Sequence, residues 1–183
     1  MNKALENIRV LDITEVWSGP ICAQYFADMG AQVIRVSGGD RARIFDTRRL
    51  RGDKEEPEGF SHSSIMRNRL GLSLDISKAD GADMVRELAG LSDILIENST
   101  PQTFPKFGLN YEKIKEINPT IVMISLSGAG QTGPWAHFPT YGPSLCALYG
   151  VSSLLGYPNE EWPREGASEA DPIAGTFGFV AAM

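Results

Sequence analysis

The sequence predicts an α/β fold built on a mostly parallel, Rossmann-like sheet with flanking helices. Two observations carry this prediction: short β-rich runs alternate with helical segments along most of the chain, and the first elements follow the order strand, helix, strand. Alternation of this kind is typical of doubly wound parallel sheets. The five expected strands are residues 9–13, 32–36, 72–75, 93–97 and 120–126.

The first unit spans residues 9–36. Residues 9–13 (RVLDI) form a short apolar run, and a helix is expected to open around Gly19 and to end at Gly30. The apolar positions of that helix recur at helical spacing: Ile21, Cys22, Tyr25, Phe26 and Met29. Residues 32–36 (QVIRV) form a second β-rich run, so the unit predicts a right-handed parallel crossover.

The middle of the chain continues the alternation after a long loop. Residues 37–59 are rich in Gly, Arg, Asp and Glu without periodicity, which indicates a surface loop at the end of the second strand, where ligands are commonly held. Helices are expected at residues 78–91 and 111–117, and the second stops before Pro119. The run that follows, residues 120–126 (TIVMISL), has the strongest strand character in the sequence.

The last third of the chain changes character. Residues 127–135 (SGAGQTGPW) predict a glycine-rich loop, and residues 142–155 predict a mostly apolar helix that is buried on most sides. A polar loop at residues 156–170 precedes an apolar helix at residues 173–183. Because that helix ends without a cap or polar tail, we expect the chain to be part of a larger domain, or a subunit that another chain completes.

Composition and charge narrow the function classes. The net charge of −6 at pH 7 disfavours a nucleic-acid or membrane-surface binder, because both kinds of partner require a basic surface. Cys22 and Cys146 are the only cysteines and lie far apart, so neither disulfides nor a metal site is expected, and a reducing, cytoplasmic setting fits. No stretch approaches the roughly 20 apolar residues of a spanning helix, so we expect a soluble protein.

The glycine-rich loop contains a pattern associated with dinucleotide binding. Gly128, Gly130 and Gly133 satisfy G-x-G-x-x-G. However, the pattern follows the fifth expected strand instead of the first, and Pro134 and Trp135 prevent a helix from starting where a pyrophosphate requires its N-terminus. A structural loop is therefore favoured over a nicotinamide site, and no redox cofactor is expected.

Asp171 is the acidic residue with the most suggestive position. It lies between a polar loop and a nearly uncharged helix, directly before Pro172, a typical first helical residue. One interpretation is a plain helix N-cap. The other is a nucleophilic carboxylate, kept ionised by the helix N-terminus and able to attack an activated acyl group. These residues alone leave both interpretations open.

Several short motifs follow one another along essentially the whole chain. They are LENIRVLDIT at residues 5–14, SGP at 18–20, ADMGAQVIRV at 27–36, IEN at 96–98, FGLNYE at 107–112, INP at 117–119, SGAGQTGP at 127–134 and ADPIAG at 170–175. In this order they resemble the class III CoA-transferases, the family of formyl-CoA and carnitine CoA-transferases. The resemblance implies that residues 1–183 are the N-terminal part of a CoA-binding large domain, and that the full-length protein forms an interlocked homodimer.

The resemblance also implies a reaction cycle. In that family the aspartate of the last motif is the nucleophile, and Asp171 falls on it. Its carboxylate attacks a donor thioester, a mixed anhydride and then an aspartyl-CoA thioester form, and the acceptor acid is loaded by the reverse steps. The implied substrates are an acyl-CoA and carboxylic acids, and the implied reaction requires no metal or redox cofactor. The implied CoA-site residues are Val16, Trp17, Ser18, Leu74, Asn98, Lys106 and Tyr141.

Three of these residues depart from the family pattern. Trp17 stands where formyl-CoA transferase has a glutamine, which predicts a bulkier, more apolar acyl pocket and makes formate and oxalate poor substrates. Lys106 replaces an arginine and can meet a CoA phosphate only as a point charge. Tyr141 stands where the related α-methylacyl-CoA racemases have a histidine, and a tyrosine with an ordinary pKa of about 10 is poorly matched to removing an α-proton. Transfer is therefore favoured, with a racemase-like enzyme and an inactive fragment or subunit as alternatives.

Overall fold

The structure, a computed structural model, describes residues 3–38, 65–156 and 169–183 of the 183-residue chain. The loops predicted at residues 37–59 and 156–170 therefore lie mostly outside the described residues. In chain order the elements are β1 (Arg9–Ile13), α1 (Ser18–Asp28), β2 (Gln32–Ser37), β3 (Arg69–Ser73), α5 (Ala79–Gly90), β4 (Ile94–Glu97), the 3-10 helix η1 (Phe104–Phe107), α6 (Tyr111–Ile117), β5 (Val122–Ser125), α7 (Gly142–Leu148), the 3-10 helix η2 (Val151–Leu154) and α8 (Ala170–Ala182).

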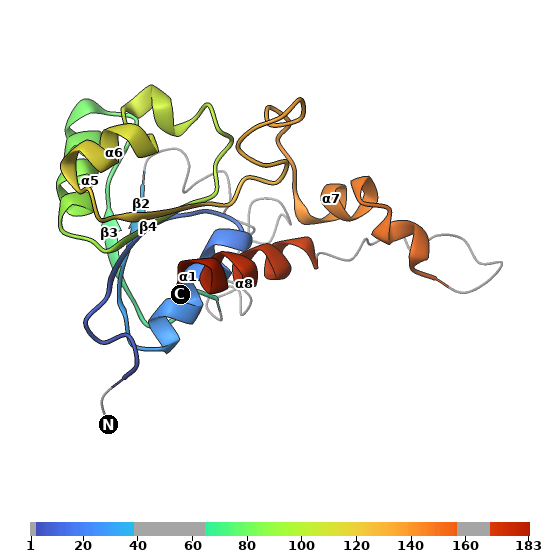
Figure 1. The fold of residues 1–183 in the computed structure, drawn as a ribbon, viewed down its shortest axis with the longest axis horizontal. Helices are drawn as coiled ribbons and strands as arrows, with labels where there is room; N and C mark the ends of the chain where they lie inside the picture. The colour runs from blue at the N-terminus through green and yellow to red at the C-terminus, as the bar shows by residue number, and fades with distance from the viewer. Residues whose placement is uncertain (1–2, 39–64, 157–168) are drawn as a thin grey trace, which may run out of the picture.

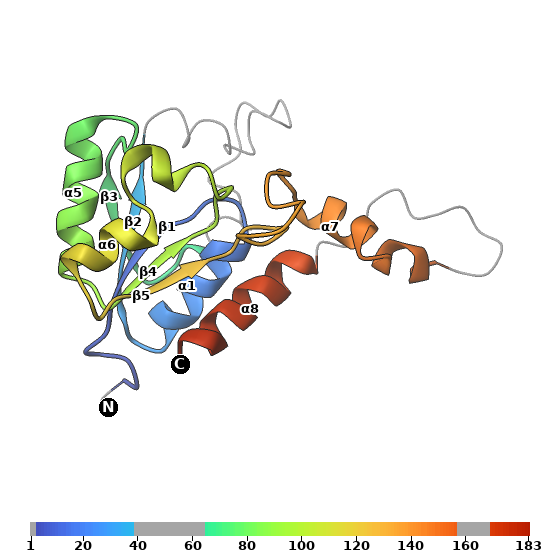
Figure 2. The ribbon, with the colours of Figure 1, turned by 45° about the horizontal axis from the view of Figure 1, so that its top comes forward.

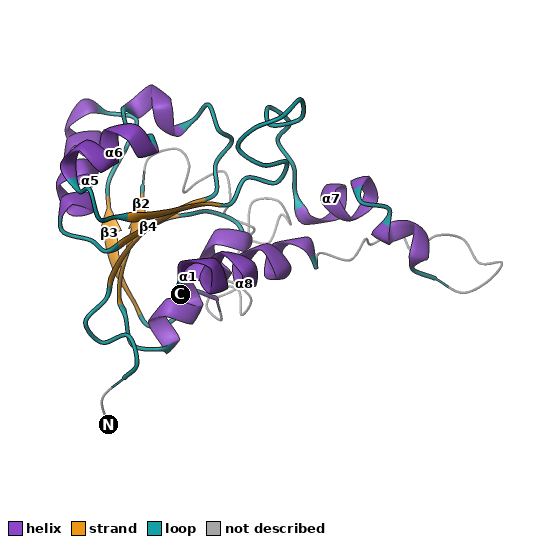
Figure 3. Ribbon diagram, in the orientation of Figure 1, coloured by secondary structure: helices purple, strands orange, loops and turns teal. Residues whose placement is uncertain are grey.

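A five-stranded parallel sheet forms the centre of the fold (Figures 1 and 3). The strand order is β3-β2-β1-β4-β5, and every neighbouring pair runs parallel. β1 lies in the middle, where Val10 pairs with Val33 on one side and with Ile94 on the other. Four of the five residues of β1 and all four residues of β4 are buried, including the charged Asp12 and Glu97, because both faces of these strands are covered. This arrangement confirms the predicted Rossmann-like α/β fold.

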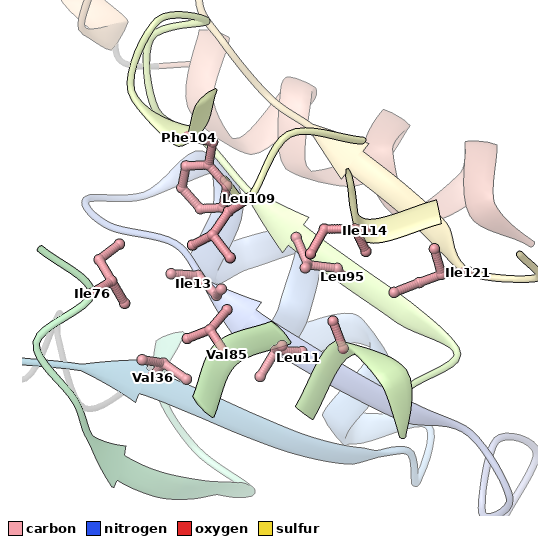
Figure 4. Close-up of a cluster of buried hydrophobic side chains, with 11 residues drawn as sticks. Leu11, Ile13, Val36, Ile76, Val85, Leu95, Phe104, Leu109, Ile114 and Ile121 are labelled. Atoms are coloured by element: carbon pink, nitrogen blue, oxygen red, sulfur yellow. The ribbon is translucent and has the colours of Figure 1, made fainter. Parts of the chain in front are cut away.

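Helices cover both faces of the sheet (Figure 2). α5 and α6 lie on one face, and α1 and α8 lie on the other. The core on the α5 and α6 side, drawn in Figure 4, consists of Leu11, Ile13, Val36, Ile76, Val85, Ala89, Leu95, Phe104, Leu109, Ile114 and Ile121. On the opposite side, Val10 and Ile96 of the sheet pack in one cluster with Phe26 of α1. The two cores hold the strand ends in fixed positions, and the candidate site lies at those ends.

Small residues allow α8 to lie directly against α1. A Cβ atom added at Gly175 would lie 2.5 Å from the backbone oxygen of Ser18, so only glycine permits this approach. One turn further along, the Phe179 ring meets the Phe26 ring edge to face, with 4.8 Å between the ring centroids. This close packing places the start of α8, which carries Asp171, beside the start of α1.

The segment expected as one buried helix at residues 142–155 is divided and largely exposed, so that prediction is wrong. α7 ends at Leu148, and Gly150 takes the left-handed conformation with a φ of 79°, which stops the helix. η2 follows, and the side chain of Leu154 is 82% exposed. The whole segment extends away from the sheet in Figure 2. Its apolar residues therefore do not join the cores described above.

Among the remaining boundaries, two elements begin three residues earlier than predicted. β3 begins at Arg69 and not at residue 72, and α8 begins at Ala170 and not at residue 173. The outer face of α8 is apolar and exposed; it carries Ile173, Phe177, Val180 and Met183. Among the helices in the three described ranges, none is long and apolar enough to cross a membrane.

Candidate functional site

A cavity of about 570 Å³ opens at the carboxyl ends of β1, β4 and β5. Its walls come from the turn after β1, the loop after β4, the loop after β5, α7 and the start of α8. The strand order explains this location. The chain leaves β1 toward β2 on one side and later returns to β4 on the other, and doubly wound folds bind ligands in the crevice at such a reversal.

Asp171 lies in the wall of this cavity, in the first turn of α8. Glu169 occupies the N-cap position and no side chain caps the helix, so the plain N-cap interpretation of Asp171 is wrong. Instead, the Ser18 hydroxyl and the backbone N–H groups of Ser18 and Gly142 lie close to the carboxylate of Asp171 and favour its ionised form. Ser18 and Gly142 are the first residues of α1 and α7, so the partial positive ends of helices meet at this carboxylate.

Burial raises the pKa of Asp171 above its ordinary value of 3.8. The hydrogen bonds from Ser18 and Gly142 act in the opposite direction, because they stabilise the carboxylate, but desolvation is the larger effect. A carboxylate that is partly desolvated yet held by oriented donors is a better nucleophile than one surrounded by water. The site can therefore perform chemistry at a carbonyl carbon that is brought next to Asp171.

The turn between β1 and α1 is unusual in its backbone. Val16, a β-branched residue, has a φ of 64°, in the region that favours glycine. Such a conformation persists only where the surroundings impose it. Here the side chain of Asn98 accepts from the Glu15 N–H at 2.8 Å and donates to the Glu15 carbonyl at 2.6 Å, and Arg35 donates to the Thr14 carbonyl at 2.8 Å. The turn is thus held from β4 and from β2.

The structure brings five of the predicted site residues together around the cavity. They are Asp171, Val16, Ser18, Asn98 and Tyr141. The remaining three lie outside its lining. Trp17 is 41% exposed at the N-cap position of α1, Leu74 follows β3 and packs against the α5 and α6 core, and Lys106 is exposed in η1. The CoA-binding roles of these residues stay predictions.

Sequence reasoning named Ser18 but missed the other hydroxyl-bearing residues that line the cavity. Seven Ser and Thr residues line it: Ser18, Ser99, Thr100, Thr103, Ser125, Ser127 and Thr140. The Oγ1 atom of Thr140 is buried and has no hydrogen-bond partner among the described residues. Thr140 lies against Gly128, where any Cβ atom would collide with it. This contact gives the first glycine of the G-x-G-x-x-G pattern a structural reason, and no helix starts between Gly128 and Tyr141.

The acidic groups of the cavity are Glu15, Glu169 and Asp171, and no lysine, arginine or histidine of the described ranges lines it. No group of three or more His, Cys, Asp or Glu side chains in the described part of the chain is arranged to hold a metal ion. Cys22 is buried in the α1 side of the core, and burial raises the pKa of its thiol to about 12. A thiol in this state is not a nucleophile at neutral pH.

The pH dependence of catalysis should follow the ionisation of Asp171. If Asp171 is the nucleophile, kcat/KM is expected to fall as the pH is lowered through its raised pKa, and therefore at a pH above 3.8. The free energy of unfolding is expected to change with pH in the opposite direction. The ionised carboxyl is disfavoured in the folded protein, so the free energy of unfolding is expected to rise as pH falls through the raised pKa, and this rise ends below 3.8.

A pH series of initial rates, with circular dichroism at each pH to exclude unfolding, tests the expected acid limb. A rate that stays constant down to pH 3.8 or lower contradicts the assignment of the raised pKa to a catalytic carboxyl. Urea unfolding over the same pH range, compared between the natural protein and Asp171→Asn, isolates the stability effect, since the variant has no carboxyl to titrate at this position.

Comparisons with known proteins agree on one family. The family model CoA-transferase family III matches residues 5–183. The chain is 32% identical over 184 aligned residues to the succinyl-CoA–D-citramalate CoA-transferase of Chloroflexus aurantiacus, covering 99% of this chain and 44% of that protein. It is 34% identical to the succinyl-CoA:glutarate CoA-transferase of Mus musculus, covering 99% of this chain and 41% of that protein. A crystal structure of a CAIB/BAIF family protein from Brucella suis superimposes with a TM-score of 0.87 at 28% identity, covering 100% of this chain and 48% of that one.

Proposed function

The chain belongs to CoA-transferase family III, and from that premise we propose that its protein transfers CoA from an acyl-CoA donor to a carboxylic acid through Asp171. One observation carries the proposal: the carboxylate of Asp171 lines a cavity of about 570 Å³ at the reversal point of the sheet, beside groups of Ser18 and Gly142 that favour its ionised form. The chain spans less than half the length of the two curated relatives, at 44% and 41%. We therefore propose residues 1–183 as the N-terminal part of a larger CoA-binding domain.

The proposed chemistry consists of two exchanges at carbonyl carbons. An oxygen of Asp171 attacks the donor thioester carbon, the C–S bond breaks, and CoA leaves as a thiolate while a mixed anhydride forms. The thiolate then attacks the Asp171 carbonyl carbon, the anhydride C–O bond breaks, and the donor acid leaves as its carboxylate. The acceptor carboxylate reverses these steps on the resulting aspartyl thioester. Each intermediate keeps the acyl group activated, so no metal or redox group is required.

The proposed CoA contacts extend beyond the cavity. Val16, Ser18, Asn98 and Tyr141 line it and would meet the reacting end of the thioester. The remaining contacts, Trp17, Leu74 and Lys106, lie outside the lining and would meet more distant parts of CoA, with Lys106 as a point charge toward a phosphate. We further propose that the reaction takes place in the cytoplasm and that the natural protein is a homodimer.

Proton transfer of the racemase kind finds no support in this cavity. His137, which follows the glycine-rich loop in the sequence, is exposed and contacts Gln102. It does not line the cavity. Tyr141 occupies the position at which a racemase histidine is expected from the resemblance. Because no histidine of the described ranges lines the cavity beside Asp171, we take acyl transfer as the reaction.

The proposal is tested by trapping the intermediate. The natural-length protein is incubated with acyl-CoA and digested, and the peptide that contains Asp171 is examined by mass spectrometry. We expect an acyl or CoA adduct on Asp171 that hydroxylamine converts to a hydroxamate, because anhydrides and thioesters both react with it. An unmodified peptide under turnover conditions contradicts the proposal.

The same assay can define the donor. Formyl-CoA is expected to give a lower kcat/KM than succinyl-CoA or a medium-chain or branched acyl-CoA, because the cavity of about 570 Å³ has room for a larger acyl group. The expectation no longer rests on Trp17, which lies outside the cavity lining. The two curated relatives are named for succinyl-CoA, which supports including it in the panel. A panel in which formyl-CoA ranks first overturns the substrate part of the proposal and leaves the transfer part in place.

A further inference from the structure

We propose that Ser18 and Asn98 form a positioning relay for Asp171, in which the Asn98 amide orients the Ser18 hydroxyl and that hydroxyl holds one oxygen of the Asp171 carboxylate. The inference rests on the proposed function, because it assigns a role in the same reaction. It differs from a CoA-binding role, since both side chains act here through Asp171 and not through contact with substrate.

The relay begins with an amide whose orientation is fixed. The Asn98 oxygen accepts from the Glu15 N–H, and its Nδ2 atom donates to the Glu15 carbonyl, so both ends of the amide are engaged by one backbone unit. The second Nδ2 proton points to the Ser18 Oγ at 3.2 Å. An amide nitrogen can only donate, so the Ser18 oxygen must accept from it. The single hydroxyl proton of Ser18 is then available for Asp171.

The relay ends at a carboxylate that is partly withdrawn from water. Ser18 is buried, with 8% of its surface exposed, so water competes little for its proton. In the proposed relay the hydroxyl and the N–H of Ser18, together with the N–H of Gly142, donate to the Asp171 carboxylate, whose ionised form all three groups favour. Asp171 and Ser18 both line the cavity, and the approach of Gly175 to the Ser18 backbone brings the starts of α8 and α1 together. A carboxylate held in this way cannot rotate freely. If the donors engage one oxygen, the other is left to attack the thioester, which is the orientation that the reaction requires.

The same donors remain useful after the first step. When CoA thiolate attacks the Asp171 carbonyl carbon of the anhydride, a C–S bond forms and negative charge develops on the carbonyl oxygen. The Ser18 hydroxyl and the backbone donors face that oxygen without rearrangement. The C–O bond then breaks, the donor carboxylate leaves, and the charge returns to the carbonyl. Loss of the hydroxyl should therefore lower kcat more than it weakens substrate binding.

A purely structural role of Ser18, such as capping α1, would involve different contacts. Ser18 is the first residue of α1, and no side chain makes a capping hydrogen bond at that end of the helix. The hydroxyl is instead in contact with Asn98 and Asp171, and all three residues line the cavity. Asn98 does hold the turn after β1, so its replacement affects both the turn and the relay. Ser18 is thus the cleaner position for a test.

The test uses Ser18→Ala and Ser18→Thr in the natural-length protein. Ser18→Ala removes a hydrogen bond that stabilises the carboxylate, so the pKa of Asp171 rises further. We expect a fall in kcat of about tenfold to a hundredfold, a KM for acyl-CoA within about threefold, and an acid limb that moves up by about one pH unit. Ser18→Thr keeps the hydroxyl and should retain most of kcat.

A second measurement does not depend on turnover. A water-soluble carbodiimide with an amine labels protonated carboxyl groups, and mass spectrometry of the Asp171 peptide gives the pH midpoint of labelling. Ser18→Ala should move that midpoint upward, and Asn98→Ala added to Ser18→Ala should move it little further, because the amide acts through the hydroxyl. The matched control is Ser77→Ala, which removes another Ser–Asp hydrogen bond, to Asp75 at 2.6 Å before α5, and should change neither kcat nor the Asp171 midpoint.

The outcomes separate the two proposals. If Ser18→Ala raises KM but leaves the pH midpoint of Asp171 labelling unchanged, the relay is overturned and Ser18 is a substrate contact. If the labelling midpoint shifts in Ser18→Ala but the natural protein forms no adduct on Asp171, the relay is supported and the proposed transfer reaction is overturned. Equal shifts in Ser18→Ala and Ser18→Thr overturn the role of the hydroxyl.

Discussion

Replacing Asp171 with asparagine is expected to lower kcat for CoA transfer at least about a thousandfold, while the affinity for acyl-CoA changes only a few-fold. Asparagine has almost the same size and can still accept hydrogen bonds from the Ser18 and Gly142 donors, so the cavity keeps its shape. The amide oxygen carries no negative charge and cannot form the anhydride. Steady-state rates with acyl-CoA and acceptor acid, and calorimetric CoA binding, measure the two effects.

The control for this variant is Asp80→Asn. Asp80 is also an acidic residue in the first turn of a helix, α5, but it is exposed and lies outside the cavity lining. We expect its kcat to stay within about twofold of the natural value, as for a surface substitution. Residual activity of Asp171→Asn must be checked by mass spectrometry for deamidation back to aspartate. A variant that keeps more than about a tenth of kcat, without deamidation, excludes Asp171 as the nucleophile.

The sheet was predictable because its signal is local. The runs RVLDI at β1 and ILIE at β4 carry apolar residues at consecutive positions, which burial on both faces favours. The helical spacing of Cys22 and Phe26 marks the buried side of α1. The failed prediction for residues 142–155 has an equally local cause. Its apolar content indicated burial, but Gly150 in the left-handed conformation ends the helix before the next apolar residues.

The candidate site was predictable only in part. Motif order pointed to Asp171, yet its partners, Ser18 and Gly142, belong to helices that are distant in sequence, and only the close approach of α8 to α1 at Gly175 brings Ser18 within reach. The sequence does not predict the left-handed conformation of Val16, because valine rarely takes it. Asn98 and Arg35 hold the turn and impose that conformation here. Contacts of this kind depend on the assembled fold.

A second large effect is expected at Arg69, which joins β3 to β1 and α1. Asp12 of β1 is completely buried; it accepts from Arg69 Nη1 at 2.6 Å and from the Thr14 hydroxyl at 2.5 Å, and Arg35 Nη1 lies 3.5 Å away. Arg69 also donates to the backbone carbonyl of Pro20 in α1. Burial lowers the pKa of Arg69 and Asp12 opposes this shift, but a guanidinium remains charged at neutral pH. β1, β3 and α1 are thus joined by one buried ion pair.

Arg69→Leu is expected to lower the free energy of unfolding by about 3 to 5 kcal/mol, because Asp12 stays buried with only the longer contact to Arg35 to balance its charge. Urea unfolding of the natural-length protein measures the loss. The matched control is Arg67→Leu, which breaks an ion pair with Asp28 whose side chains are 50% and 30% exposed, and should change stability by no more than about 1 kcal/mol.

The double variant Arg69→Leu with Asp12→Leu distinguishes the charge effect from the loss of packing. If the penalty of Arg69→Leu comes from an uncompensated buried carboxylate, removing that carboxylate should restore part of the stability, since apolar replacements of a buried pair are often neutral. Arg35 then keeps its contacts with the Thr14 carbonyl and Glu15. A double variant less stable than Arg69→Leu, or an Arg69→Leu variant no less stable than Arg67→Leu, contradicts the view that this pair holds β1, β3 and α1 together.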